Sequence, residues 1–424
     1  MSRWTECDAE QHLLGLELFG MRFGLERMHR LTTALGMPQS RFAQVHVVGS
    51  NGKSSTVRFI AAILERHGLR TGGYTSPHLR RFRERIEVGE SPIPPDRFAV
   101  AVQRAAEAAA LVDRAAPDRD DTVTQFELLT AAAFDELATS DVDLAVVEAG
   151  LGGRFDATNV IPSKVQVLTG VGLEHTRWLG PTIADIATEK LAIVRDHATL
   201  VIPDDLHPDA LVVAEQVALE RHARLVVAPT VAATSADPSL DMAARGAFQR
   251  RNFALACAAA EAFLERPLDH RAVEAAAAET PVPGRLEVVA ERPLTIHDGA
   301  HNPAGAAALA AALPEVIRDR RPLVLLISVL EDKDAADMLK PLLPLADHLV
   351  LTRCSNPRAL PPATLESLAS QLNGPESDVV VNPLQALDRA RELATPAGAV
   401  LATGSIYLIA DLVRDRGETQ ASAL

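Results

Sequence analysis

The amino-acid sequence predicts an α/β protein of two domains, each built on a mostly parallel sheet. The first observation is the length of 424 residues, which exceeds the usual size of one domain. The second is a regular alternation of short apolar runs with segments of helical periodicity. The third is Pro281-Val282-Pro283-Gly284, a cluster of turn-forming residues after which the alternation begins again.

The first elements along the chain form a helix, a strand and a second helix. Residues 9–36 carry apolar side chains at helical spacing, and Pro38 closes that segment. The apolar run 44–48 predicts a strand, and residues 56–67 predict a helix that ends at Gly68. Further apolar runs, separated by helical patterns, predict strands at 144–147, 165–168 and 200–202.

A glycine-containing turn, Gly49-Ser50-Asn51-Gly52-Lys53-Ser54, joins the strand at 44–48 to the helix at 56–67. Small residues there let backbone N–H groups point at phosphate oxygens, and Lys53 adds positive charge for the outer phosphates. The spacing is shorter than in GxxxxGK[ST], because position 47 is Val and not Gly. We interpret this turn as a nucleotide-phosphate loop, the alternative being an ordinary turn between a strand and a helix.

The second half of the chain predicts a smaller, Rossmann-like α/β domain. Strands are expected at 294–297, 323–327, 348–351, 378–381 and 399–402, with helical segments between them. We therefore expect an N-terminal P-loop-type domain of residues 1–283, flanked by helices, and a C-terminal domain of residues 284–424.

The charge balance and the cysteines limit the class of function. The chain has 42 Lys and Arg against 56 Asp and Glu, a net charge of −14, which argues against nucleic acid or an acidic membrane as the main partner. Cys7, Cys257 and Cys354 are far apart, so no disulfide framework or cysteine zinc site is expected. The first residues lack a signal-peptide pattern, and no apolar run approaches the roughly 20 residues of a membrane span. We expect a reduced, cytoplasmic protein.

Polar residues follow several predicted strands, at the edge where parallel sheets bind ligands. Ser76 could ligate magnesium or belong to an ordinary Ser-Pro turn, and Glu148 could bind Mg²⁺ or be a solvated strand end. His175 is an unusual type of magnesium ligand, so its residue type favours a structural or hydrogen-bonding role. Lys190 lies on a predicted helix, where an ordinary surface lysine is the plain interpretation.

Two segments of the second domain also stand out. The first is Pro283-Gly284-Arg285. The second, residues 297–303, reads His-Asp-Gly-Ala-His-Asn-Pro and follows a predicted strand. Asn302 is expected to cap the following helix, with Pro303 at its first position. A ligand site and a capped turn both fit this segment.

Taken in order, these segments resemble the folylpolyglutamate synthase/dihydrofolate synthase family, a branch of the Mur-ligase-like ATP-dependent amide ligases. The resemblance covers nearly the whole chain and rests on Gly24-Leu25-Glu26-Arg27, Gly49-Ser50-Asn51-Gly52-Lys53, Thr75-Ser76-Pro77-His78-Leu79, Glu84-Arg85-Ile86, Thr124-Gln125-Phe126-Glu127, residues 148–159, Glu174-His175, Leu179-Gly180, Glu189-Lys190, Asn252, Pro283-Gly284-Arg285, residues 298–303, Asp332-Lys333-Asp334 and Gly404-Ser405.

The chain departs from the family pattern at two places. The family usually has Thr-Asn-Gly-Lys-Gly where this chain has Ser50-Asn51-Gly52-Lys53-Ser54, so the Ser54 side chain is expected to alter the loop or to offer a hydroxyl to a metal. The usual Asp-His pair is Glu174-His175 here, a conservative change at the metal site. Neither departure removes a functional group that the resemblance requires.

The resemblance implies a role for each group of residues. ATP would be bound by Ser50, Asn51, Gly52, Lys53, Ser54, Asn252, Arg285 and Asp298. Magnesium, as two ions, would be held by Ser76, Glu148, His175 and Lys190, the last as N6-carboxylysine. The pteroate pocket would be lined by Arg22, Phe23, Gly24, Leu25, Thr124, Gln125, Phe126, Glu127, Phe155, Asp156 and Ala157. The incoming glutamate would meet His301 and Ser405, and the catalytic set would be Lys53, Lys190, Arg285, Asp298 and His301. The resemblance also admits a monovalent cation.

The implied activity is ATP-dependent addition of L-glutamate to dihydropteroate, to reduced folates or to both, through an acyl phosphate. The acting unit would be a cytoplasmic monomer of folate biosynthesis and one-carbon metabolism, whose C-terminal domain completes the ATP site and binds glutamate. Two alternatives stay open. One is a Mur-type ligase with another carboxylate acceptor, which the segments 124–127 and 155–157 disfavour. The other is a non-catalytic P-loop nucleotide-binding protein, which Glu148, His175 and Lys190 disfavour.

Overall fold

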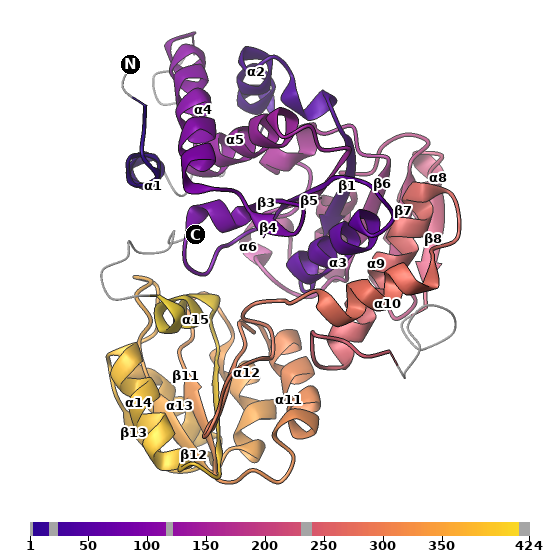
Figure 1. The fold of residues 1–424 in the computed structure, drawn as a ribbon. Coiled ribbons are helices and arrows are strands. Elements are labelled where there is room, and N and C mark those ends of the chain that lie inside the picture. The colour runs from indigo at the N-terminus through magenta and orange to yellow at the C-terminus, as the bar shows by residue number, and fades with distance from the viewer. Residues whose placement is uncertain (1–2, 17–23, 116–121, 230–239, 415–424) are drawn as a thin grey trace.

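The computed structural model describes residues 3–16, 24–115, 122–229 and 240–414. These residues form two α/β units, one above the other in Figure 1, and each has helices on both faces of its own sheet. None of the described helices combines the length and the apolar composition needed to cross a membrane.

The first unit contains an eight-stranded sheet in the order β4-β3-β2-β5-β1-β6-β7-β8. Strands β2 and β5 to β8 join β1 in the parallel part, whereas β2-β3 and β3-β4 pair antiparallel. The strands are β1 (Ala43–Val48), β2 (Thr71–Tyr74), β3 (Ile86–Val88), β4 (Ser91–Pro92), β5 (Leu144–Glu148), β6 (Val165–Leu168), β7 (Thr199–Pro203) and β8 (Arg224–Ala228).

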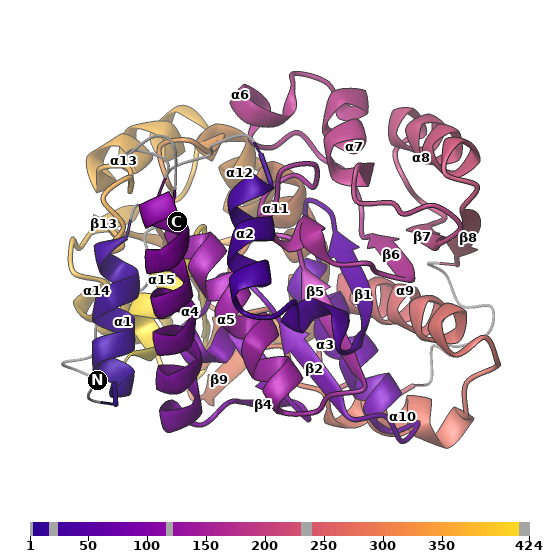
Figure 2. The ribbon, with the colours of Figure 1, turned by 90° about the horizontal axis from the view of Figure 1, so that it is seen from above.

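Helices cover both faces of this sheet, so β1 is buried on both sides (Figure 2). Val45 and Val47 pack with the helices of one face, and Val48 packs with those of the other. One face carries α3 (Lys53–Glu65), α9 (Ala247–Leu264) and α10 (His270–Glu279). The other carries α1 (Glu6–Gly15), α2 (Glu26–Ala34), α4 (Pro95–Ala115), α5 (Gln125–Thr139), α7 (Ile183–Leu191) and α8 (Pro208–Glu220). Short helices are η1 (Pro38–Ser40), η2 (Phe82–Arg85), η3 (Ala157–Val160) and α6 (Thr176–Leu179).

The second unit contains a six-stranded sheet in the order β13-β12-β11-β14-β10-β9, parallel except for the β9-β10 pair. Its strands are β9 (Glu287–Glu291), β10 (Leu294–His297), β11 (Leu323–Ile327), β12 (His348–Leu351), β13 (Ser377–Val379) and β14 (Ala399–Thr403). One face carries α11 (Pro303–Ile317), α12 (Ala335–Leu342), η4 (Leu343–Leu345) and α13 (Pro362–Gln371), and the other carries α14 (Pro383–Ala394) and α15 (Ile406–Val413).

The α/β class and the mostly parallel sheets are confirmed, and several details differ from the sequence prediction: β8 was not predicted, and β13 ends at Val379 where residues 378–381 were expected. The segment 9–36 contains two helices, α1 and α2, in its described part. Helix α3 starts at Lys53 and not at residue 56, because Gly52 takes a left-handed conformation (φ +83°) that turns the chain directly into the helix. Strand β9 forms an antiparallel edge that the apolar pattern did not indicate, since its residues are only partly buried. The predicted division after residue 283 falls in the link between α10 and β9.

A buried ion pair ties α2 to α5. Arg27 Nη2 lies 3.0 Å from Glu127 Oε1, and the two side chains are 8 % and 9 % exposed. The same carboxylate accepts hydrogen bonds from the backbone N–H (2.9 Å) and hydroxyl (3.0 Å) of Thr124, which caps α5. Two elements 100 residues apart are thus fixed by one acidic side chain.

Replacing Arg27 by Met should lower the free energy of unfolding by about 3–5 kcal/mol, because Glu127 would keep a buried charge without its partner. Equilibrium urea denaturation measures the change. The matched control is Arg30→Met, since Arg30 pairs with Glu26 on the exposed face of the same helix. That change should cost less than about 1 kcal/mol. Equal losses in the two variants would show that the buried pair does not stabilise the α2–α5 contact.

Candidate active site

The candidate site lies where the carboxyl ends of the three central strands meet. Strands β5, β1 and β6 are neighbours, and each is followed by a polar loop. The loop after β1 is the predicted phosphate loop, β5 ends in Glu148, and the segment after β6 contains Glu174 and His175. Residues that are more than 120 positions apart along the chain therefore share one edge of the sheet, the usual ligand edge of such folds.

The two glycines of the phosphate loop are required by their neighbours. A Cβ atom on Gly49 would lie 1.9 Å from Thr169 Oγ1, and one on Gly52 would lie 2.4 Å from Asn252 Oδ1. The Thr169 hydroxyl donates a hydrogen bond to the Asn51 carbonyl oxygen (2.6 Å). The loop is thus seated against β6 and α9, and it leads into the N-terminus of α3, where free N–H groups favour an anion.

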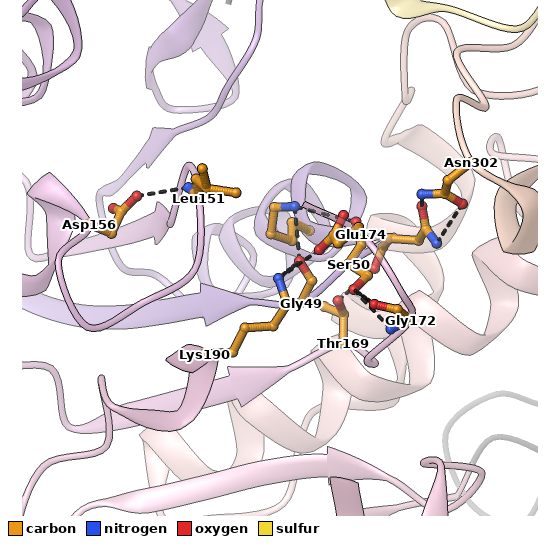
Figure 3. A network of polar contacts seen from close by, with 11 residues as sticks. Gly49, Ser50, Leu151, Asp156, Thr169, Gly172, Glu174, Lys190 and Asn302 are labelled. Atoms are coloured by element: carbon orange, nitrogen blue, oxygen red, sulfur yellow. Dashed lines mark hydrogen bonds and ion pairs between the residues drawn. The ribbon is translucent and has the colours of Figure 1, made fainter. Parts of the chain in front are cut away.

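Lys190 occupies the centre of a polar network beneath this loop (Figure 3). Its Nζ donates to the Gly49 carbonyl oxygen (3.0 Å) and to Glu174 Oε1 (2.8 Å). Lys53 Nζ also donates to the Gly49 oxygen (3.0 Å), while the Ser50 hydroxyl accepts from the Gly172 N–H (3.0 Å). Lys190 is only 2 % exposed, so the plain interpretation as a surface lysine was wrong.

Burial and mutual attraction together set the charges of the Lys190–Glu174 pair. Burial lowers the pKa of Lys190, and the Glu174 carboxylate opposes that shift. Burial alone would raise the pKa of Glu174, but Lys190, Lys53 and hydrogen bonds from Lys190 and Ser50 lower it to about 2. Glu174 is therefore ionised at neutral pH, and its charge favours the ammonium form of Lys190.

Glu148 is a buried carboxylate without a matching cation. It is 2 % exposed, and its Oε2 accepts a hydrogen bond from the Ser76 N–H (3.1 Å). Burial raises its pKa, against the opposing effects of Lys53 and of hydrogen bonds from the Ser54 hydroxyl and the Ser76 N–H. It forms no ion pair within the part of the chain that the structure describes. The Ser54 hydroxyl, a departure from the family pattern, is thus directed to this carboxylate.

The residues at this edge fit Mg²⁺ when a nucleotide completes the ligand set. The described ranges hold no group of three or more His, Cys, Asp and Glu side chains able to bind a metal by themselves. Glu148 offers a buried carboxylate, and the neighbouring Ser76 offers a hydroxyl. Mg²⁺ commonly takes one or two carboxylates and fills its other positions with phosphate oxygens and water.

His175 lies at the contact between the two units. It caps α6 with a left-handed backbone (φ +47°). Burial, and after it the Lys333 ammonium, lower the pKa of its imidazole to about 4, so the ring is neutral at pH 7. Lys333, which pairs with Asp332 at 3.0 Å, also lowers the pKa of His301. Lys333 therefore belongs to the site, although its motif carried no assigned role in the sequence.

The second unit brings a buried acid and a guanidinium to the same place. Both carboxylate oxygens of Asp298 accept backbone hydrogen bonds of 2.8 Å, from the N–H groups of Leu286 and Ala300. Burial raises the pKa of Asp298, and Arg285 opposes the shift. Arg285 has the same effect on Glu148 of the first unit, so its positive charge lies near the acids of both.

His301 has a defined tautomer. Its Nδ1 lies 2.9 Å from the Gly299 carbonyl oxygen, which can only accept, so Nδ1 carries the proton and Nε2 is bare. Burial and then Arg285 lower the pKa of His301 to about 4, which keeps the ring neutral at pH 7. Ser405, the other residue predicted to meet glutamate, is 1 % exposed and caps α15.

A reciprocal amide pair joins the phosphate loop to the second unit. Asn51 Nδ2 donates to Asn302 Oδ1 (3.2 Å), and Asn302 Nδ2 donates to Asn51 Oδ1 (2.9 Å). Asn302 Oδ1 also accepts from the Gly305 N–H (2.8 Å), which confirms it as the cap of α11. The contact across 251 positions had no signal in the sequence beyond the predicted cap.

The predicted pteroate residues lie around α5 and η3. Phe155 is 44 % exposed, and the Phe126 ring lies against the backbone of Gly150. Asp156 is 6 % exposed, and its Oδ2 accepts from the Leu151 N–H (2.9 Å, Figure 3). The other described members are Gly24, Leu25, Thr124, Gln125, Glu127 and Ala157, whose roles stay predictions. Arg22 and Phe23 lie outside the described residues.

The chain is similar to known proteins. Residues 284–406 match the family model of the Mur ligase, glutamate ligase domain. The dihydrofolate synthase/folylpolyglutamate synthase of Mycobacterium tuberculosis is 35 % identical over 412 residues, which cover 88 % of this chain and 83 % of that protein. The enzyme of the same name from Bacillus subtilis is 32 % identical over 431 residues, with coverage of 96 % and 97 %.

Solved structures agree over both units. Mycobacterium tuberculosis folylpolyglutamate synthase complexed with ADP matches with a TM-score of 0.89 and 32 % identity, over 97 % of this chain and 99 % of that one. Escherichia coli FolC in complex with DHPP and ADP matches with a TM-score of 0.82 and 27 % identity, over 96 % of each chain. With the phosphate loop and its surroundings in place, the chain belongs to the dihydrofolate synthase/folylpolyglutamate synthase family of ATP-dependent glutamate ligases.

Proposed function

We propose that this chain joins the amino group of L-glutamate to the carboxylate of dihydropteroate, of reduced folates or of both, and converts ATP to ADP and phosphate. The observation that carries the proposal is the meeting of two units at one phosphate loop. Lys53 and Glu148 come from the first unit, and Arg285 and Lys333 bring positive charge from the second. The names of the relatives and the DHPP-bound FolC structure support a pteroate-type acceptor.

In the first step, an acceptor carboxylate oxygen attacks the γ-phosphorus of ATP, the bond to the bridging oxygen breaks, and ADP leaves. Lys53 would exchange the Gly49 carbonyl (3.0 Å) for phosphate oxygens and stabilise their growing charge. Arg285 would add positive charge from the second unit. Glu148, Ser76 and His175 would hold Mg²⁺, which would neutralise phosphate charge when bound.

In the second step, the glutamate nitrogen attacks the acyl carbon, the tetrahedral adduct expels phosphate, and an amide forms. The incoming ammonium group must lose its protons on the way. The bare Nε2 of the neutral His301 is a group that can accept one. Because the two units supply different groups, their closure would complete the site and exclude water from the acyl phosphate. One chain contains every group named, so the proposal needs no partner subunit.

Lys190 is proposed to react with CO₂ when metal is present. Its neutral amine would attack CO₂, forming an N–C bond and an anionic carbamate and releasing one proton to water. Burial favours the neutral amine, whereas the Glu174 ion pair (2.8 Å) favours the ammonium. A carbamate beside Glu174 would place two negative charges together, which a cation must offset. Carboxylation and metal binding are therefore expected to occur together.

The substrate assignment is tested by phosphate release from MgATP. Release should require L-glutamate and either dihydropteroate or tetrahydrofolate, because the acyl phosphate needs both an acceptor carboxylate and an attacking amine. Activity with both acceptors assigns both folate reactions, and activity with one assigns that reaction alone. If phosphate release requires neither acceptor but requires another carboxylate compound, the proposal is wrong and the chain is a Mur-type ligase of different specificity.

The carbamate is tested by Lys190→Arg. Arginine can still pair with Glu174 but cannot form a carbamate, so ligation should fall below detection while circular dichroism stays that of the wild type. A ¹³C NMR carbamate signal should form from ¹³CO₂ in the wild type and be missing in the variant. The control is Lys164→Ala, an exposed lysine at the opposite end of β6. Normal turnover by Lys190→Arg would rule out a catalytic carbamate.

The amide pair is tested by Asn302→Ser and Asn51→Ala. Serine retains the cap of α11 but is too short to reach Asn51, so the first variant removes the contact between the units and keeps the helix. Two lost hydrogen bonds, each worth about 0.5–1.5 kcal/mol, should lower kcat/KM for ATP by about tenfold. The double variant should lose no more than either single one. Additive losses would show that the two side chains act separately.

A further inference from the structure

A second pocket lies away from the phosphate loop, mainly in the second unit. It is formed by α14, the end of α15, the β9–β10 edge and Arg80 of the first unit. Its volume is about 490 Å³, which is within the range of small-molecule sites. None of the nucleotide, metal or pteroate residues assigned above lines it.

The charge of this pocket is opposite to that of the whole chain. The chain carries a net charge of −14, yet three arginines and one aspartate line the pocket, namely Arg80, Arg391, Arg414 and Asp388. Arg414 lies 3.7 Å from Asp411, so its charge is partly matched. Arg80 and Arg391 form no ion pair with any described residue. Two unmatched guanidinium groups, one from each unit, thus face one cavity.

His297 supplies a second and independent observation. It lines the same pocket and is 3 % exposed, and neither ring nitrogen has a hydrogen-bond partner within the described ranges. Buried polar atoms in proteins are rarely left in this state. Burial and then Arg391 lower the pKa of His297 to about 4, so the ring is neutral at pH 7 and offers one N–H donor. A ligand atom that accepts a hydrogen bond would satisfy this donor.

The rest of the lining is aliphatic. Leu384 and Leu387 come from α14, and Leu412 and Val413 come from the end of α15. A guanidinium binds a carboxylate through two parallel hydrogen bonds, and leucine side chains suit methylene groups. The pocket therefore combines two guanidinium groups that can bind carboxylates with aliphatic side chains.

We propose that this pocket binds a dicarboxylate with a short aliphatic chain, of the glutamate and glutamyl class. Arg80 and Arg391 each bind one carboxylate, and His297 donates a further hydrogen bond. The class follows from the lining alone, whereas the choice of glutamate and its γ-linked peptides rests on the proposed function. Free glutamate and a terminal glutamyl residue share this chemistry.

Isothermal titration of the full chain without ATP tests the proposal. The probes are glutarate, L-glutamate, γ-glutamylglutamate and inorganic phosphate. At least one dicarboxylate should bind, and Arg391→Gln or Arg80→Gln should weaken it about tenfold or more, the loss of one charge-assisted pair. The control is Arg389→Gln on the same helix, because Arg389 pairs with Asp378 (2.6 Å) and does not line the pocket. It should leave binding unchanged.

Three results would overturn the proposal: no heat of binding up to about 10 mM dicarboxylate, equal binding by wild type and both arginine variants, or tighter binding of phosphate than of every dicarboxylate. Arg80 is exposed, so Arg80→Gln still tests the pocket if Arg391→Gln fails to fold. Phosphate release measured on the same proteins separates the two proposals. If a dicarboxylate binds through Arg391 but the chain has no ligase activity, only the proposed function is wrong. If the chain is an active ligase but no dicarboxylate binds, only the proposal for this pocket is wrong.

Discussion

The buried Lys190 ammonium is the charge on which the arrangement of the site depends. It binds the Gly49 carbonyl of the phosphate loop and the Glu174 carboxylate after β6, so one side chain from α7 joins the ends of two neighbouring strands. A buried charge persists only when it is paired and hydrogen-bonded. The loop, the acid and the helix must therefore keep their relative positions, and the glycines that seat the loop against β6 and α9 follow from the same constraint.

Several acidic side chains of the predicted site accept hydrogen bonds from backbone N–H groups. Asp298 accepts two N–H groups of its own loop, and Asp156 accepts the N–H groups of Leu151 and Thr158. Glu127 is occupied by Thr124 and an arginine. Glu148 has a backbone donor but no ion pair in the described structure. Acidic residues near a phosphate site thus divide into those that shape loops and one whose charge still requires a cation.

The sequence predicted what depends on local pattern and missed what depends on distant contacts. Strands, their parallel arrangement and the phosphate loop followed from apolar runs and glycine spacing, which are local signals. The predicted helix alone made Lys190 a surface lysine, and only the resemblance placed it in the site, because its contact with the phosphate loop spans 141 positions. Asn302 was predicted as a cap, but its bond to Asn51 was not, since nothing in a short window encodes a partner in another unit. Lys333 was assigned no role for the same reason.

The Asn51–Asn302 contact carries no net charge, and this has a consequence for how the two units associate. An exposed ionic contact weakens as salt is added, whereas paired amides are dipoles whose attraction ionic strength barely alters. The Asn51–Asn302 contact itself should therefore persist as ionic strength rises, so a salt-sensitive step in this molecule would point to its charged groups and not to this amide pair.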